Sequence, residues 1–297
     1  MKLKQFAGLT LAAIGMIAPP VMSQSAAPNK VSPVLQDVRD GQSKKLIYEL
    51  NATAYLFFIP VTGKATWDVL LDDRGTYKID SRVKTTGIAD IFVDYDMRLS
   101  SSGYVREDGL QTYNYISQNY DGKKNRRVEM TYGADDVSMT ATPRFGDLGF
   151  PPATPAQKLQ ALDPVTAMLD IGFQPRDPDK PCGGPIETFD GKQLTRLNLT
   201  YQGPADIKTK AWRGKGIECH VQLERVAGYN EGDKGKNLSG IDGPMQMFFA
   251  EALPGMMVPV KIVVDTKEIG KITVETSRLE LVDVNPREAS ANGLSKS

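Results

Sequence analysis

The sequence predicts an all-β domain, mainly antiparallel, in which a curved open barrel or β-spiral wraps around one short helix. From residue 46 onward, apolar residues recur with period two, which places them on one face of extended strands. Clusters of turn-forming residues separate these stretches about every ten to fifteen residues, as expected for an antiparallel meander. A helical period interrupts the strands between residues 142 and 191.

The first three strands have the clearest alternation. We expect turns at residues 60–63 and 72–75 to separate them. Their apolar faces carry Leu46, Tyr48, Leu50, Ala52, Ala54, Leu56 and Phe58, then Ala65, Trp67, Val69 and Leu71, then Tyr77, Ile79, Ser81 and Val83. Tyr55 and Phe57 lie on the opposite face of the first strand. Near its end that strand is therefore apolar on both faces, which indicates that other groups cover each of its two faces.

The later strands are predicted from the same period and from turn residues between them. The predicted ranges are 95–105, 111–120, 126–132 and 137–142, followed after the interruption by 197–201, 217–223, 258–264 and 272–274. Residues 245–253 fit either a helix or a buried strand, and we favour the strand.

One short helix is predicted to begin at Pro164 and to end by Gly172. Asp163 is suited to cap its first amides, and Pro164 to occupy the first helical position. Val165, Met168 and Leu169 form an apolar stripe that would pack on the sheet. If this cap exists, replacing Asp163 with Ala should cost about 1 kcal/mol.

The N-terminus has the layout of a signal peptide over residues 1–23. Lys2 and Lys4 precede an apolar stretch that ends before Pro19, too short for the roughly 20 residues of a membrane-spanning helix. The alternative is a retained anchor helix. We expect a mobile N-terminal segment over 24–43, a single β domain over 44–286 and a mobile tail over 287–297, in a protein that is soluble in the periplasm.

Cys182 and Cys219 are the two cysteines of the chain. An oxidising compartment allows them to form a disulfide with a structural role. The alternative is a pair of free, buried thiols, since Cys219 lies on the apolar side of its strand.

Composition and motifs argue against several function classes. Lys plus Arg equals Asp plus Glu at 36 each, so the chain lacks the positive charge that nucleic acids attract. Motifs of serine hydrolases, phosphate-binding loops and zinc proteases are absent, and His220, the one histidine, lies on the polar face of a strand. Asp177 and Asp179 only weakly resemble a calcium loop. We therefore expect no catalytic residues, no metal and no cofactor.

A curved sheet around one helix often leaves an apolar groove, which suits an acyl chain or a hydrophobic peptide. The alternative is that helix and loop cover the sheet completely. The residues predicted to line the groove are Tyr48, Leu50, Leu56, Trp67, Val69, Tyr77, Ile79, Met168 and Leu169.

Residues from about 46 to 284 resemble the bacterial DUF3108 family of exported envelope proteins. The resemblance rests on the stretches 48–50, 61–65, 85–87, 162–169, 189–192 and 258–262, with Cys182 and Cys219. It implies a periplasmic, mostly β protein of unassigned activity, similar to the open barrels of lipoprotein carriers and envelope-integrity proteins. It supplies no catalytic residues, and emphasises Asp163, Pro164, Asp190, Gly191 and the cysteines. Asp190 and Gly191 suit a tight turn in which the glycine has a positive φ angle.

Together these observations predict a non-enzymatic periplasmic protein that supports the cell envelope by binding a hydrophobic ligand, a lipid or lipoprotein, or an envelope protein partner. Two alternatives remain. One is an envelope hydrolase that uses paired carboxylates, whose spacing depends on the fold. The other is a purely structural interaction module.

Overall fold

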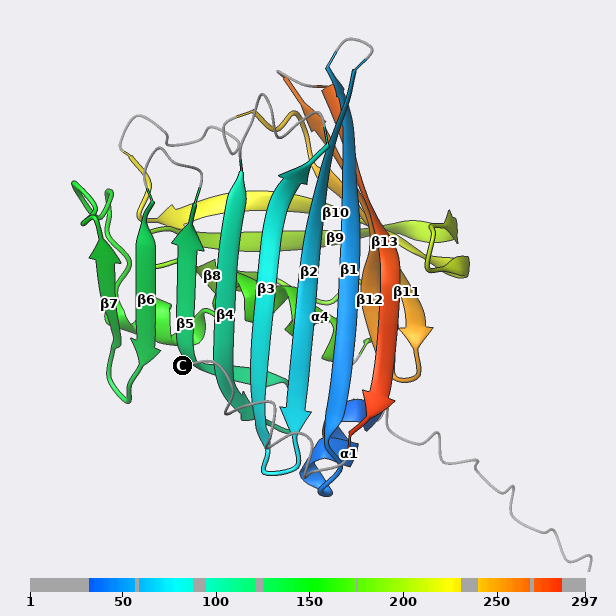
Figure 1. The fold of residues 1–297 in the computed structure, drawn as a ribbon, viewed down its shortest axis with the longest axis horizontal. Coiled ribbons are helices and arrows are strands. Elements are labelled where there is room, and N and C mark those ends of the chain that lie inside the picture. Colours follow the sequence, from blue (N-terminus) through cyan, green and yellow to red (C-terminus); the bar gives the residue numbers. More distant parts are fainter. Residues whose placement is uncertain are drawn as a thin grey trace, which may run out of the picture.

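A computed structural model describes residues 32–56, 59–87, 95–120, 125–174, 176–230, 240–267 and 270–284. Most of these residues belong to one antiparallel sheet of thirteen strands (Figure 1). The first seven strands are β1 (Lys44–Leu56), β2 (Ile59–Asp72), β3 (Thr76–Thr86), β4 (Asp96–Val105), β5 (Leu110–Asn119), β6 (Arg127–Tyr132) and β7 (Val137–Thr142). The other six are β8 (Ile186–Phe189), β9 (Leu194–Lys208), β10 (Arg213–Ala227), β11 (Met245–Leu253), β12 (Met256–Thr266) and β13 (Gly270–Asp283). The helices are α1 (Pro33–Arg39), α3 (Pro155–Gln160) and α4 (Pro164–Phe173).

The sheet consists of two meanders joined at β1. From β1 one meander runs outward in chain order to β7, and the other runs from β13 backward to β8. The sheet curves so that the two halves face each other, and β7 and β8 are its two ends (Figure 1). The described strands therefore form an open barrel, and the predicted all-β antiparallel fold class is confirmed.

Helix α4 lies inside the curve, where it contacts β8 and β12 from one half and β3, β4 and β5 from the other (Figure 1). Val165, Leu169 and Phe173 are buried in the core. Asp163 caps the helix and Pro164 is its first residue, as the sequence predicts. The helix fills the space that the curved sheet encloses, because a 13-stranded sheet is too wide for its own side chains to fill.

The core consists of the inward-facing residues of the strands, and its alternation agrees with the predicted period of two. Buried members include Leu46, Tyr48, Leu50, Trp67, Val69, Leu71, Tyr77 and Ile79. Burial of each such aliphatic or aromatic side chain stabilises the fold by about 1.5–3 kcal/mol relative to exposure. Residues 245–253 form strand β11, which confirms the favoured alternative.

The structure differs from the sequence prediction near the N-terminus. Residues 33–39, expected within a mobile segment, form helix α1, whose Val34, Leu35 and Val38 are buried in the core. The folded part thus begins about ten residues before the expected boundary. The turn expected at 60–63 is part of β2, where Pro60 pairs with Tyr55. The predicted signal peptide and tail lie outside the described residues.

Candidate functional site

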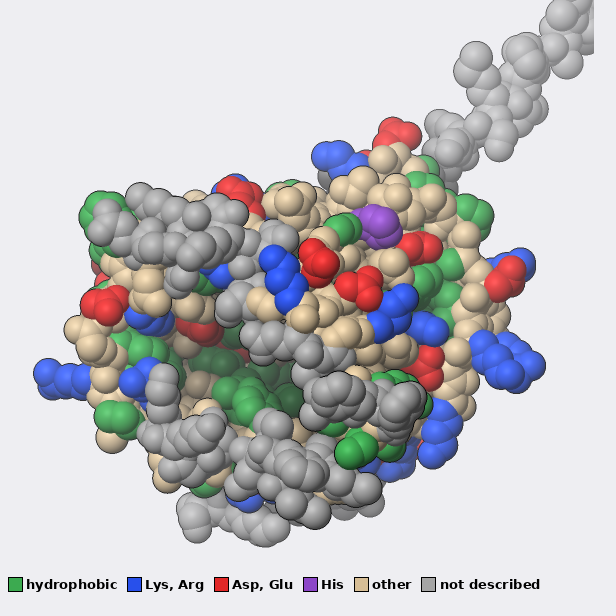
Figure 2. Space-filling view, turned by 90° about the horizontal axis from the view of Figure 1, so that it is seen from above, with side chains coloured by type: hydrophobic (Ala, Val, Ile, Leu, Met, Phe, Trp, Pro, Cys, Tyr) green, Lys and Arg blue, Asp and Glu red, His purple; other side chains and the backbone are tan. Residues whose placement is uncertain are grey.

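A pocket of about 500 Å³ opens at the end of the barrel where β5 ends and β6 begins. It lies between the inner faces of β4, β5 and β6 and the turn that joins β8 to β9. Among the described residues, its lining consists of Met97, Leu99, Tyr115, Ser117, Asn119, Arg126, Val128, Phe145, Pro164, Asp190, Lys192 and Gln193. Figure 2 shows this end of the molecule, with hydrophobic side chains at the bottom of a hollow.

The polarity of the pocket changes along β5. Tyr115, deepest along the strand, is only 2% exposed, and Ser117 and Asn119 follow on the same face toward the strand's end. Leu99 lies opposite Ser117 on β4, and Val128 lies opposite it on β6. The pocket thus has apolar walls in its interior and polar side chains at its open end, as amphiphilic ligands require.

The turn between β8 and β9 closes one side of this pocket. The carboxylate of Asp190 accepts hydrogen bonds from the amides of Lys192, at 2.9 Å, and Gln193, at 2.7 Å. Burial raises the pKa of Asp190, while these amides lower it. Gly191 has a φ of 102°, and a Cβ atom there would lie 2.5 Å from Val128. The predicted tight turn is confirmed, and its glycine is needed both for its φ and for its approach to β6.

Two cations lie at the open end of the pocket, beside the ring of Phe145. The guanidinium carbon of Arg126 is 4.5 Å from the ring centroid, and the ammonium of Lys192 is 6.0 Å from it. Lys192 also forms an ion pair with Asp147, at 3.1 Å. The open end therefore carries two cationic groups beside one aromatic ring, and one of them is paired with an acid.

Asp163 fastens the start of α4 beside the pocket. One carboxylate oxygen accepts from the amides of Val165 and Thr166, each at 3.0 Å. The other accepts from the hydroxyls of Ser101 on β4 and Thr112 on β5, each at 2.8 Å. Burial raises the pKa of this carboxyl, and the four hydrogen bonds oppose that effect. The contacts hold Pro164, a lining residue, against the sheet.

Asp170, near the end of α4, makes stability depend on pH. Its carboxylate accepts from the amide of Leu110 and from Gln174, and burial raises its pKa to about 6. Between about pH 4 and 6 the Asp170 carboxyl therefore binds more protons in the folded protein than in the unfolded chain, so its contribution to stability falls as pH rises through this range, by up to about 3 kcal/mol. Urea unfolding should show Asp170→Asn to be more stable than the parent at pH 7 and about equal to it below pH 4. A difference that does not change with pH would contradict this assignment.

The residues that the sequence predicts for an apolar groove do not line this pocket. Tyr48, Leu50, Trp67, Val69, Tyr77, Ile79 and Leu169 are buried in the core, and Met168 packs against it. The side chain of Leu56 is outside the described residues. Alternation identifies the inner face of the sheet, but α4 and the opposite half cover this part of it. The uncovered part lies farther along the sheet, on β4 to β6.

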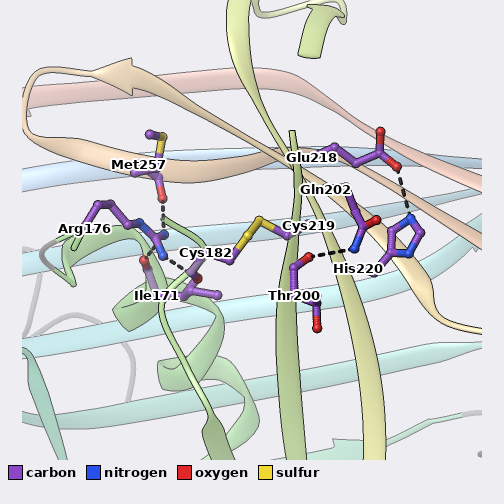
Figure 3. The surroundings of a disulfide bond; sticks show 9 residues. All are labelled: Ile171, Arg176, Cys182, Thr200, Gln202, Glu218, Cys219, His220 and Met257. Atoms are coloured by element: carbon purple, nitrogen blue, oxygen red, sulfur yellow. Dashed lines mark hydrogen bonds and ion pairs between the residues drawn. A yellow bond between two sulfur atoms is a disulfide. The ribbon is translucent and has the colours of Figure 1, made fainter. Parts of the chain in front are cut away.

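The predicted disulfide is present, and joins Cys182, in the loop between α4 and β8, to Cys219 on β10 (Figure 3). The partly buried guanidinium of Arg176 supports the same loop by donating to the carbonyls of Cys182, Ile171 and Met257 (Figure 3). Burial lowers the pKa of Arg176 to about 10. Both cysteines belong to a second hydrophobic cluster with Phe249.

The remaining candidates lie outside the pocket. The Nε2 atom of His220 is 3.2 Å from Glu218 on the same strand (Figure 3). Asp177 accepts from the amide of Asp179 within its own turn. Within the described ranges, no group of three or more His, Cys, Asp or Glu side chains is arranged to hold a metal ion.

Sequence reasoning missed the residues that line the pocket, although the sequence contains a signal for some of them. Tyr115, Ser117 and Asn119 alternate on one face of a predicted strand. Lys192 directly follows the Asp-Gly turn that the sequence indicates. Phe145 and Arg126 have no such pattern, because their place depends on how two loops meet.

Residues 48–277 match the family model described as "Protein of unknown function (DUF3108)". The chain belongs to this family. No curated protein matches it. Among solved structures, this DUF3108 protein is similar to a β-barrel-like DUF1849 protein from Brucella abortus, with 10% identity, a TM-score of 0.47, and coverage of 82% of this chain and 98% of that one. A DUF1329 protein from Desulfovibrio piger is also similar, with 12% identity, a TM-score of 0.29, and coverage of 83% of this chain and 88% of that one. None of the helices in the described ranges is long and apolar enough to span a membrane.

Proposed function

We propose that this DUF3108 protein is an exported, non-enzymatic protein of the cell envelope that binds the apolar part of a lipid or lipoprotein in the pocket between β4–β6 and the β8–β9 turn. The pocket itself carries the proposal. Its volume of about 500 Å³ is within the range of about 300–1,000 Å³ that is typical of small-molecule sites. Its walls include Leu99, Val128 and Phe145, which suit a hydrocarbon chain.

Two further observations support export. Residues 1–23 have the composition of a signal peptide. The disulfide between Cys182 and Cys219 is of a kind that persists in oxidising compartments such as the periplasm.

Binding is favoured over hydrolysis by the chemistry of the lining. Of the twelve lining residues in the described part of the chain, Asp190 alone is acidic, and its carboxylate is engaged by the amides of its own turn. Glycoside hydrolysis needs two carboxyl groups about 5–9.5 Å apart on either side of the bond. The pocket offers space and amphiphilic walls, so we expect contact rather than covalent chemistry.

Filling the pocket should abolish ligand binding. Ser117 lines its middle, so Ser117→Trp places an indole where the chain of the ligand would lie. We expect this variant to bind the fluorescent hydrophobic probe N-phenyl-1-naphthylamine at least tenfold more weakly than the parent. Native mass spectrometry should show co-purified lipid on the parent protein and none on the variant.

The matched control is Ser138→Trp, on the exposed face of β7, which should bind as the parent does. Asn119→Trp, at the open end, tests the same point if Ser117→Trp fails to fold. Unchanged probe binding in a folded pocket variant, or a parent protein that binds neither probe nor lipid, would contradict the proposal.

A further inference from the structure

The two cations beside Phe145 come from parts of the chain that are distant in sequence. Arg126 precedes β6, and Lys192 lies in the β8–β9 turn, beside the opening between the two ends of the sheet. Their charged groups are 4.5 Å and 6.0 Å from the same ring centroid, and both side chains line the pocket. The fold thus brings two positive charges together at the open end of an apolar cavity.

Like charges in one pocket repel each other, so nearby acids decide whether the two cations are already neutralised. Lys192 is paired with Asp147, but the side chain of Asp147 is 69% exposed, and water screens such a pair strongly. Asp190 also faces the pocket, and its carboxylate is held by the amides of Lys192 and Gln193. These two acids reduce the net positive charge near the cations, and one of them is exposed while the other is held by its own turn.

Arg126 retains donors for a ligand. Among its contacts with described residues, the guanidinium donates to the carbonyl oxygens of Pro143, at 3.0 Å, and Arg144, at 3.5 Å. A guanidinium has five N–H donors in a planar fork that matches the oxygens of a carboxylate or phosphate. Carbonyl partners orient this fork but do not neutralise its charge. The stacking of Arg126 on Phe145 restrains it further at the edge of the pocket.

We propose that Arg126 and Lys192 together bind the anionic head group of an amphiphile whose hydrocarbon chain occupies the pocket. This inference rests on the proposed function and narrows its ligand to acyl compounds with a carboxylate or phosphate at one end. The apolar walls accept the chain, and the two cations beside Phe145 accept the acid. A neutral lipid of the same length lacks the second of these interactions.

The test compares two fluorescent ligands that differ only in charge, cis-parinaric acid and its methyl ester. The variants are Arg126→Gln, Lys192→Gln and the double variant. Arg127→Gln is the matched control, because Arg127 is the next residue but is exposed and pairs with Glu129 on the outer face. The double variant should bind the acid at least about tenfold more weakly, since charge-assisted hydrogen bonds are lost, and should bind the ester within twofold of the parent. Arg127→Gln should bind both ligands as the parent does.

The outcomes separate this inference from the proposed function. If parent and double variant bind the acid equally well, the head-group assignment is wrong while the hydrophobic pocket stands. An equal loss of acid and ester binding also overturns it, because the cations would then only maintain the pocket. If the parent binds neither ligand, both proposals fail. Displacement of bound parinarate by oleate or by lysophosphatidylglycerol distinguishes a carboxylate source from a phosphate source, and displacement by neither would overturn the inference.

Discussion

Replacing Asp163 with Ala should lower the free energy of unfolding by about 4 kcal/mol. The side chain is fully buried, and its two oxygens accept four hydrogen bonds. Alanine would leave two amides of α4 and the hydroxyls of Ser101 and Thr112 without this acceptor. Each buried donor that loses its partner costs about 1 kcal/mol or more. The loss should appear as a lower midpoint in urea unfolding, with an unchanged slope.

Asp163→Asn is the matched control, because its one carbonyl oxygen can still accept from the amides of Val165 and Thr166. It should lose less than half as much stability as Asp163→Ala. Thr112→Val removes one hydroxyl donor and should cost about 1 kcal/mol. A loss of only about 1 kcal/mol for Asp163→Ala would mean that Asp163 stabilises the protein only by capping α4. Its hydrogen bonds with β4 and β5 would then contribute nothing to the free energy of unfolding.

This prediction also shows where sequence reasoning stops. The motif of Asp163 and Pro164 correctly predicts a helix start, and a cap alone is worth about 1 kcal/mol. The second oxygen contacts Ser101 and Thr112, which are 62 and 51 residues away in the sequence. Their polar side chains on an inner face look like breaks in an apolar pattern until the helix is placed against them.

The strands were the most predictable part of the fold. A half-buried strand must alternate, and the alternation from Tyr95 to Thr142 predicts β4 to β7 to within one or two residues at most ends. Helices α1 and α3 were not predicted, because at seven and six residues they are too short for a periodic pattern. Val34, Leu35 and Val38 have helical spacing, but they fall in a segment whose polar composition indicates no fold.

The pocket was not predictable, because its place depends on tertiary structure. Tyr77 and Tyr115 both lie on inner faces of predicted strands, and the sequence pattern around them does not show which one lines a pocket. The hydroxyl of Tyr77 is bound to Thr166 of α4, at 3.0 Å, so the helix covers it. Tyr115 lies on β5, two strands away from β3 in the sheet, and lines the pocket instead. Which inner residues line the pocket therefore depends on where α4 packs against the sheet.

Loss of the disulfide should destabilise the protein about as much as the loss of Asp163. The bridge closes a loop with a sequence separation of 37, for which the chain-entropy model gives about 4 kcal/mol. The variant Cys182→Ala/Cys219→Ala should therefore unfold at a lower urea concentration than the parent. The parent unfolded in reductant is the control, since it keeps both side chains and loses only the bond. The free energies of unfolding of the double variant and of the reduced parent should agree within about 1 kcal/mol. A loss of less than about 1 kcal/mol in both would contradict the structural role of the disulfide.

The position of the bridge predicts where this loss is concentrated. Strand β8 has four residues and is the end strand of the open sheet, so its ladder pairs with β9 alone apart from a bridge to Leu162. The disulfide ties the segment leading into β8 to β10, two strands farther in. Without it, hydrogen exchange should accelerate in β8 and in the turn that carries Asp190 and Lys192 more than in β1 to β3, which are paired on both sides. Loss of the disulfide should also weaken the binding of cis-parinaric acid, since Lys192 belongs to that turn. Equal acceleration throughout the sheet would show that the bridge acts only on the unfolded chain.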